Sequence, residues 1–232
     1  MFERYNRQII LDGIGIEGQN KIKNASVLIV GVGGLGSIVS LYLTAAGIGK
    51  IGLIDDDTVS ISNLQRQILY KESDLNLPKV DCAKKRLNEL NSEVSFVLYC
   101  EKLNSENVET IIPKYDIIVD GCDNFETRYL IDDVCVKYNK PYVFGAISEF
   151  SGQVSVFNYK GGATYQDLFP IETVKRKSGK QSSGVLGVLP GIIGSIEANE
   201  AIKIIAGIGD VLSNKLFSIN LLTMESNIFE IK

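Results

Sequence analysis

Four charged residues in this chain have types suited to holding a nucleoside triphosphate. Asp55, Arg66, Lys79 and Asp123 lie where successive expected strands or turns end near a glycine-rich loop. Cationic side chains neutralise phosphate oxygens, one carboxylate can bind a metal ion, and another can accept hydrogen bonds from ribose hydroxyls. The ends of strands converge on one crevice in a doubly wound sheet, so we expect these side chains to meet there. A bound NAD would not obviously need Arg66, Lys79 and Asp123 together.

The glycine-rich loop is the second feature with binding chemistry. It reads GVGGLG at 31–36 and follows a short apolar run. Gly31 and Gly33 permit a tight turn that lets backbone N–H groups approach a phosphate, and Gly36 lets the next helix pack close to the strand. The alternative is a βαβ unit that uses its glycines only for packing.

The elements around this loop are in the order that a nucleotide site requires. An apolar run at 27–30 precedes the loop, a helical segment at 37–46 follows it, and a second apolar run at 51–54 ends in three aspartates at 55–57. An acid at the end of the second strand would hold a ribose hydroxyl. The pattern predicts a nucleotide site without choosing between NAD, FAD and ATP.

Composition sets limits on the partners of the chain. The 232 residues carry a net charge of −4 and are 45% hydrophobic, which disfavours a general nucleic-acid or anionic-membrane binder. No run of about 18 apolar residues is present to span a membrane. The start of the chain, MFERYNRQIILDG, is too polar for a signal peptide. We therefore expect a cytoplasmic protein that binds neither nucleic acid nor membrane.

Cysteine and histidine content excludes several kinds of chemistry. The chain has no histidine, and its four cysteines, at 82, 100, 122 and 135, are not in CxxC spacing. A structural zinc site is therefore not expected. Catalysis that depends on a Ser-His or Cys-His pair is excluded, so any reaction must proceed without an imidazole base.

The remaining pattern predicts one α/β domain over residues 1–232, with a Rossmann-like, doubly wound and mostly parallel sheet extended by antiparallel strands at the C-terminal side. It would comprise an N-terminal arm (1–24), a nucleotide-binding half (25–150) and an antiparallel extension (151–232). Residues 4–9 are expected to be a surface arm, and 159–184 a long irregular loop that is functional or mobile. Helices are expected at 15–24, 78–90, 106–112, 127–138 and 189–206, and further strands at 94–99, 116–119, 142–147, 153–157, 215–221 and 227–231.

Eight stretches together resemble the family of ThiF, MoeB and HesA, bacterial and archaeal relatives of the ubiquitin-activating enzyme. They are RYNRQI, GVGGLG, DDDTVSISNLQRQ, PK, DGCDNFETRY, GQVSVF, GVLG and GSIEANEAIK, in chain order. The resemblance covers the chain from Arg4 to about Lys232. It implies an enzyme that adenylates a carboxylate with ATP and Mg²⁺, commonly the C-terminal glycine of a ubiquitin-fold sulfur carrier.

The resemblance also implies roles for single residues. Asp55 would hold the ribose hydroxyls, Lys79 would hold phosphate, and Asp123 would bind Mg²⁺. The nucleotide site would comprise Gly31, Gly33, Gly34, Gly36, Asp55, Asp57, Ser62, Asn63, Leu64, Gln65, Arg66, Lys79, Asp123 and Asn124, with Asn63 and Arg66 as the main polar contacts of the segment 62–66. Arg7 matches the arginine that reaches the phosphates of a neighbouring subunit, so a homodimer is implied, with Arg7, Arg66, Lys79 and Asp123 as catalytic residues.

This chemistry is consistent with the lack of histidine. A terminal carboxylate has a pKa of roughly 3.5 and is ionised at pH 7, so no general base is required. The carboxylate attacks the α-phosphorus, pyrophosphate leaves, and preplaced cations stabilise the charge that accumulates on the phosphate oxygens.

The chain departs from the family at its cysteines. Many relatives bind zinc through two CxxC pairs, the first in a CxxC-LFP setting, where this chain has Thr164, Asp167 and then Leu-Phe-Pro. The second pair would follow Lys232. A reactive cysteine found in several relatives is replaced by Lys180, and we interpret Cys122 as a small packed residue rather than a nucleophile.

Two classes of substrate remain open, a sulfur carrier protein and a small-molecule carboxylate. The methanogen enzyme that activates the pyridinol carboxylate of the iron-guanylylpyridinol cofactor resembles the same family. The basic run at 175–180 could contact an anionic substrate, although such runs are usually solvated. Further alternatives are a peptide-modifying or inactive relative, an NAD-dependent oxidoreductase, and a dimer that senses ATP without catalysis.

Overall fold

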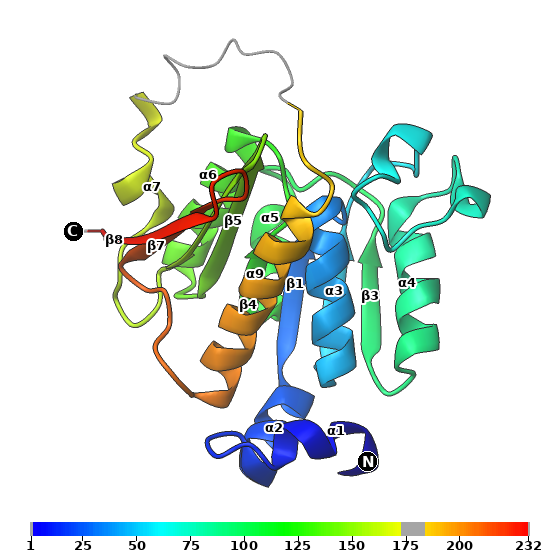
Figure 1. Cartoon of the computed structure of the whole chain (residues 1–232), viewed down its shortest axis with the longest axis horizontal. Coiled ribbons are helices and arrows are strands. Elements are labelled where there is room, and N and C mark those ends of the chain that lie inside the picture. Colours follow the sequence, from blue (N-terminus) through cyan, green and yellow to red (C-terminus); the bar gives the residue numbers. More distant parts are fainter. Residues whose placement is uncertain (1, 173–183, 232) are drawn as a thin grey trace.

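One eight-stranded sheet forms the centre of the computed structural model, which describes residues 2–172 and 184–231. Its strand order is β3-β2-β1-β4-β5-β6-β7-β8 (Figure 1). Strands β1 to β5 pair in parallel, and β6 to β8 add antiparallel pairs. The predicted sheet is therefore confirmed. The strands are β1 (Ser26–Val30), β2 (Lys50–Ile54), β3 (Ser95–Tyr99), β4 (Ile117–Asp120), β5 (Tyr142–Ser148), β6 (Ser151–Phe157), β7 (Lys215–Asn220) and β8 (Glu225–Glu230).

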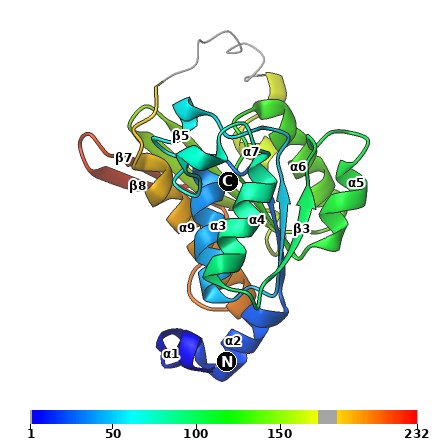
Figure 2. The ribbon, with the colours of Figure 1, turned by 90° about the vertical axis from the view of Figure 1, so that its right-hand side faces the viewer.

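Helices cover both faces of this sheet, as Figures 1 and 2 show. Alternate residues of a strand point to opposite faces, so Val27 and Ile29 of β1 join one buried core, and Leu28 and Val30 join the other. The first face carries α3 (Gly34–Ala46), α4 (Lys79–Leu90) and α9 (Leu189–Ala206), and the second carries α5 (Val108–Ile111), α6 (Phe125–Lys137) and α7 (Tyr165–Leu168). The two layers fix the parallel strands so that their carboxyl ends meet at one edge.

The helix boundaries follow from local capping. α6 begins at Phe125, ahead of the predicted residue 127, because the Asn124 side chain accepts a hydrogen bond from Thr127 N (2.9 Å). α3 ends at Gly47, whose φ of 85° is the left-handed conformation that favours glycine. The helices predicted at 15–24, 78–90 and 189–206 match α2 (Gly15–Asn24), α4 and α9 within one residue.

The segment expected as a surface arm at 4–9 is helical, because Phe2–Ile9 forms α1, on which Arg4 and Arg7 are exposed. The buried Tyr5 anchors it: its hydroxyl accepts a hydrogen bond from Asn91 Nδ2 (2.8 Å) and donates one to Glu93 Oε2 (3.2 Å). Both partners lie some 86–88 positions away in sequence. Tertiary contacts of this kind leave no periodic signal in a six-residue motif.

The expected irregular loop at 159–184 is only partly irregular, because it contains the short helix α7. Residues 173–183 lie outside the described part of the chain, and the whole basic run at 175–180, which includes Lys180, lies among them. Among the helices of residues 2–172 and 184–231, none combines the length and apolar character needed to cross a membrane.

Glu197 of α9 is an acidic residue that lies inside the core between α9 and the sheet. Its residue is fully buried, and neither carboxyl oxygen has a hydrogen-bond partner among the described residues. The carboxyl lies against Gly145 of β5, where a Cβ would collide with it. Burial, with the charge of Asp120 as a smaller cause, raises the pKa of Glu197 well above 4.5.

Candidate active site

A cleft of about 500 Å³ opens at the carboxyl ends of β1, β2 and β4, at the upper edge of the sheet in Figure 1. Its floor is made by two turns in close contact. Gly31, with a φ of 88°, donates from its N–H to Ile54 O (2.8 Å), and Gly121 donates to Val30 O (2.7 Å). A Cβ on Gly31 would lie 2.6 Å from Gly121 O. Only glycine allows the ends of β1 and β4 to approach so closely.

The cleft brings together the four charged residues whose convergence the sequence predicts. Asp55, Arg66, Lys79 and Asp123 all line it. So do six of the other residues expected in a nucleotide site: Gly31, Gly33, Gly34, Asp57, Asn63 and Asn124. Ser62, Leu64 and Gln65 lie on the segment beside the cleft and are not among its lining residues, and Gly36 instead packs against Gly31, where a Cβ would collide with the carbonyl oxygen.

Asp55 is held at the glycine loop by backbone groups. Its Oδ2 accepts a hydrogen bond from Val32 N (2.7 Å), and its Oδ1 accepts one from Asp57 N (2.9 Å). Burial raises the pKa of Asp55, while the nearby Lys79 and the two N–H groups oppose this shift. The carboxylate thus has a fixed place between β1 and β2, with lone pairs left to accept hydrogen bonds from a ligand.

Lys79 is the first residue of α4 and is nearly buried. Its Nζ lies 2.7 Å from Oδ2 of Asp57, and its backbone N–H donates to Asp57 O (3.0 Å). An antiparallel bridge between Thr58 and Pro78 ties the same two segments together. Asp57 therefore positions the lysine, a contact that the sequence alone does not predict.

Arg66 follows a 3₁₀ turn, Ile61–Asn63, whose last residue, Asn63, also lines the cleft. Its Nη1 donates to Ser62 O (3.2 Å), and a Cβ on Gly34 would lie 3.8 Å from its Cγ. The guanidinium is half-buried beside the glycine loop and keeps donors for an anion. Gln67, which sequence reasoning left out, is buried in the same cleft, and its Oε1 has no partner among the described residues.

Asp123 lies on the turn between β4 and α6 and is exposed. Its carboxylate makes no hydrogen bond or ion pair with the residues that the structure describes. A carboxylate that is free and faces a cleft is a suitable ligand for Mg²⁺. The side chain of Asn124 is instead the N-cap of α6. Cys122 lines the cleft, but burial raises the pKa of its thiol well above 9.0, so it is no ready nucleophile.

Arg7 lies far from this cleft. It is an exposed residue of α1, and Figure 1 shows α1 below the sheet, at the end opposite to the cleft. Arg7 therefore does not line the cleft of its own chain.

The segment that would hold zinc in relatives has a different donor set. Thr164 and Asp167 form a reciprocal cap: Thr164 N donates to Asp167 Oδ2 (2.7 Å), and the Thr164 hydroxyl donates to the same oxygen (2.9 Å). The buried Asp132 accepts hydrogen bonds from Tyr165 N (2.9 Å) and Gln166 N (3.2 Å). A hydroxyl and one carboxylate do not replace two thiolates. These residues do not fit a four-cysteine zinc site, whatever follows Lys232.

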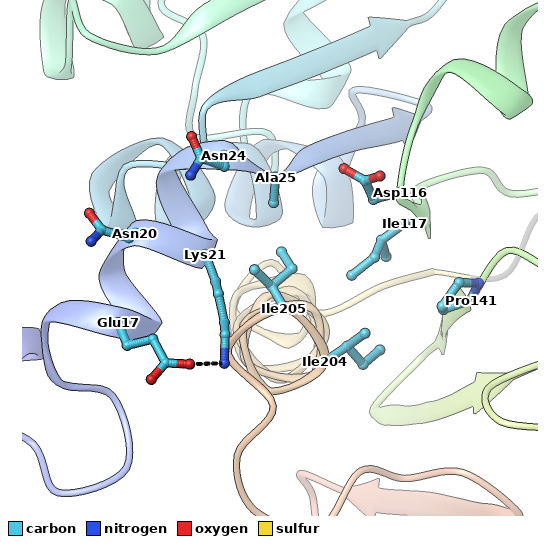
Figure 3. Close-up of a pocket in the computed structure, with 10 residues that line it drawn as sticks. All are labelled: Glu17, Asn20, Lys21, Asn24, Ala25, Asp116, Ile117, Pro141, Ile204 and Ile205. Carbon is cyan, nitrogen blue, oxygen red and sulfur yellow. Dashed lines mark ion pairs between the residues drawn. The ribbon is translucent and has the colours of Figure 1, made fainter.

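A second cavity, of about 510 Å³, lies at the amino ends of the strands, and Figure 3 shows the residues that line it. Its charged groups are already engaged: Lys21 pairs with Glu17 (2.8 Å), and Asp116 accepts from Ser26 N (2.8 Å). Ile204 and Ile205 of α9 form an apolar wall. This groove lacks convergent free polar groups, so the cleft with Asp55 and Asp123 is the better candidate for chemistry.

Comparisons with known proteins show the family of this chain. The chain matches the ThiF family over residues 5–232. It is 48% identical over 232 residues to a probable molybdopterin-synthase adenylyltransferase of Porphyra purpurea, a match that covers 99% of this chain and 61% of that protein. It is 46% identical over 220 residues to the sulfur carrier protein adenylyltransferase of Thermus thermophilus, covering 92% of this chain and 81% of that protein.

Solved structures extend the comparison to three dimensions. The crystal structure of E. coli MccB with ATP superposes with a TM-score of 0.85 at 26% identity, covering 98% of this chain and 71% of that one. The chain spans about three-fifths of the Porphyra protein and about half of the adenylyltransferase and sulfurtransferase MOCS3 of Culex quinquefasciatus. The chain therefore belongs to the ThiF family, whose match over residues 5–232 includes both the glycine loop and the C-terminal hairpin.

Proposed function

We propose that this protein is an ATP-dependent adenylyltransferase that joins AMP to the C-terminal glycine carboxylate of a ubiquitin-fold sulfur carrier and releases pyrophosphate. The observation that carries the proposal is the meeting of Asp55, Arg66, Lys79 and Asp123 around one glycine loop. This set offers an acid to ribose, cations to phosphate and a free carboxylate to a metal ion. The names of the Porphyra and Thermus relatives support the reaction class.

Each residue of the cleft has a separate role in the proposed reaction. Asp55 holds the ribose, and the first N–H groups of α3 face the phosphates. Arg66 and Lys79 offset the charge that develops as the acyl carboxylate attacks the α-phosphorus and pyrophosphate departs. Asp123 would hold Mg²⁺, which supplies further positive charge at the phosphates when bound. No side chain has to remove a proton, because the attacking carboxylate is already ionised at pH 7.

The proposed substrate is a protein rather than a small acid. The Thermus relative is named for a sulfur carrier protein and the Porphyra relative for molybdopterin synthase, and neither name indicates a small-molecule carboxylate. The surface offers room for a protein partner, because β8 is an exposed edge strand. The hairpin of β7 and β8 presents exposed apolar side chains: Leu222, Met224, Ile228 and Phe229.

We also propose that the protein is a homodimer in which Arg7 serves the cleft of the partner subunit. Arg7 is exposed and remote from its own cleft. Exposed apolar side chains follow it in the chain: Ile10, Leu11 and Ile16 are each more than half exposed, at 59%, 54% and 55%. Such residues suit a protein interface when they lie close to an arginine that pairs with none of the residues described in the structure.

Isotope exchange tests the proposed function. Radiolabelled pyrophosphate should enter ATP when the protein, Mg²⁺ and a ubiquitin-fold carrier with a free C-terminal glycine are present. The matched control is the same carrier with its C-terminal carboxyl converted to an amide, which should support no exchange. Failure of the free carrier, together with exchange on a small carboxylate, would overturn the choice of substrate. Failure with every carboxylate would overturn the reaction class.

A further inference from the structure

Arg128 is a buried charge at the back of the cleft that the reaction outlined above does not use. It lies on the first turns of α6 and is among the residues that line the cleft. Its Nε donates to Asp120 Oδ2 (2.8 Å), and its Nη2 donates to Cys122 O (2.9 Å) and Gly145 O (3.1 Å). One guanidinium thus joins α6, the end of β4, the turn after it and β5.

Asp120 completes the same network from the other side. Its side chain is fully buried, and its Oδ1 accepts hydrogen bonds from Cys122 N (2.9 Å) and from the Cys122 thiol. Its Oδ2 also accepts one from the Tyr142 hydroxyl (3.0 Å). Both backbone polar groups of Cys122 are therefore held, the N–H by Asp120 and the carbonyl by Arg128.

This network acts on the residue that follows. Asp123 is exposed and has no hydrogen bond or ion pair with the described residues, so its own side chain does not fix its place. Its position depends on the peptide that precedes it, and that peptide begins at the carbonyl of Cys122, which Arg128 binds. Groups that orient a metal ligand without touching the metal commonly change metal affinity by about 10-fold to 100-fold when they are mutated.

Stability alone is a weak reason for such a network. A buried ion pair is often no more stabilising than well-packed apolar residues of similar volume, because both charges must leave water. Arginine is suited to the task because its planar fork reaches several acceptors at once, and here its face also lies over the ring of Phe144, 5.1 Å from the centroid. A lysine could retain the charge but could not reach Asp120, Cys122 and Gly145 together.

We propose that Arg128 is a positioning residue, which holds the Cys122 carbonyl so that the Asp123 carboxylate is placed to bind the metal of a metal–nucleotide complex. The inference rests on the adenylyltransferase function proposed above, because that function gives Asp123 its metal. It goes beyond that function by assigning an effect on metal affinity to Arg128, which acts through the Cys122 carbonyl.

The test compares Arg128→Lys with the wild-type full-length protein. Binding of Mn²⁺ in the presence of ATP is followed by electron paramagnetic resonance, and the Mg²⁺ concentration for half-maximal pyrophosphate exchange is measured in parallel. We expect both metal constants to weaken by about 10-fold to 100-fold, while ATP binding without metal changes little and saturating Mg²⁺ restores much of the exchange. A change in folding alone would lower the active fraction without shifting the metal constants.

Tyr142→Phe is the matched control, because it removes one hydrogen bond from the same Asp120 carboxylate and leaves the contact of Arg128 with Cys122. It should lower the melting temperature without moving the metal constants. If Arg128→Lys does not fold, the double variant Asp120→Asn, Arg128→Gln removes both charges and leaves none unpaired, and it should show the same shift. Wild-type metal constants in the folded variants would overturn the inference. Loss of exchange in the wild type, with Mn²⁺–ATP binding intact, would instead overturn the proposed function.

Discussion

The Nζ of Lys79 lies 2.7 Å from Oδ2 of Asp57, and the two partners differ sharply in exposure, at 4% and 69% of their side chains. The ammonium is enclosed by protein, whereas the carboxylate remains open to solvent. The two removals therefore differ. Removing Asp57 leaves the Lys79 ammonium buried without its partner, whereas removing Lys79 leaves the Asp57 carboxylate in contact with water.

The first prediction uses this asymmetry. Lys79→Met should lower pyrophosphate exchange by about 10²–10³-fold. It should cost less stability than the loss of Asp57, because Asp57 itself stays hydrated and only Asp55 loses a nearby positive charge. Asp57→Ala should instead lower the free energy of unfolding by about 1–3 kcal/mol, because it strands a buried ammonium. Urea unfolding and exchange assays on both variants check this, with the exposed neighbour variant Asp56→Ala as the control. Equal stability losses in the Lys79 and Asp57 variants would contradict it.

Substitution of Asp123 should reduce activity without changing stability. Because the side chain is exposed and unbonded to the described residues, Asp123→Ala should leave the melting temperature unchanged. The rate of exchange should fall by about 10²–10³-fold, since a charge at the phosphates is lost. Calorimetry and the exchange assay are sufficient, and a variant that exchanges at the wild-type rate would refute the metal role.

The proposed action of Arg7 across a dimer can be tested by complementation. Arg7→Ala and Asp123→Ala should each be nearly inactive alone. A mixture reassembled from equal amounts should recover about a quarter of the wild-type activity, because half of the dimers are mixed and each has one intact cleft of two. A mixture as inactive as its components would exclude action in trans, and a monomeric mass in light scattering would exclude the dimer itself.

Glu197 predicts a pH dependence of stability. Its folded pKa is raised above 4.5, so the folded chain keeps a proton that the unfolded chain has lost. Unfolding then releases a proton, and the free energy of unfolding falls as pH rises from 4.5 through the folded pKa. Glu197→Gln should remove this loss of stability. The free energy of unfolding of the variant, relative to that of the wild type, should therefore increase by about 1.4 kcal/mol per pH unit in that window. Urea unfolding from pH 5 to 8 measures the difference, in which the contributions of other acids cancel. A difference that does not vary with pH would show that the carboxyl is ionised in the folded chain.

The cap at Thr164 and Asp132 predicts a fold that needs no zinc. Treatment with a strong zinc chelator should leave the melting temperature unchanged. Asp132→Ala should lower the free energy of unfolding by about 1–3 kcal/mol, because the buried N–H of Tyr165 and the partly buried N–H of Gln166, at the start of α7, lose their acceptor. Asp133→Ala, on the exposed side of α6, is the control and should have little effect, because it removes only an exposed hydrogen bond from Gln166 Nε2 (2.8 Å). A chelator that lowers the melting temperature would contradict the prediction.

The sequence predicts the sheet and much of the cleft because both depend on order along the chain. Strand, glycine loop, helix and acid fix where Asp55 must lie, and the ends of parallel strands bring Asp123 near it. Contacts made across the fold were not predictable. Lys79 meets Asp57 only because the segment before α4 forms a bridge to the turn after β2. In the sequence, Arg128 looks like a surface residue of α6, but it is buried because it contacts β5. Glu197 likewise looks like a surface residue of α9, but it is buried because Gly145 has no side chain in the space that it fills.

The contact between Gly31 and Gly121 has a consequence for how this protein can change over time. Each glycine occupies the space where the other's side chain would stand, so even alanine at one position would push the ends of β1 and β4 apart. A second substitution cannot repair the first, because both would add atoms to the same gap. Any larger residue at either site therefore has to be accompanied by a shift of the backbone that separates the two turns.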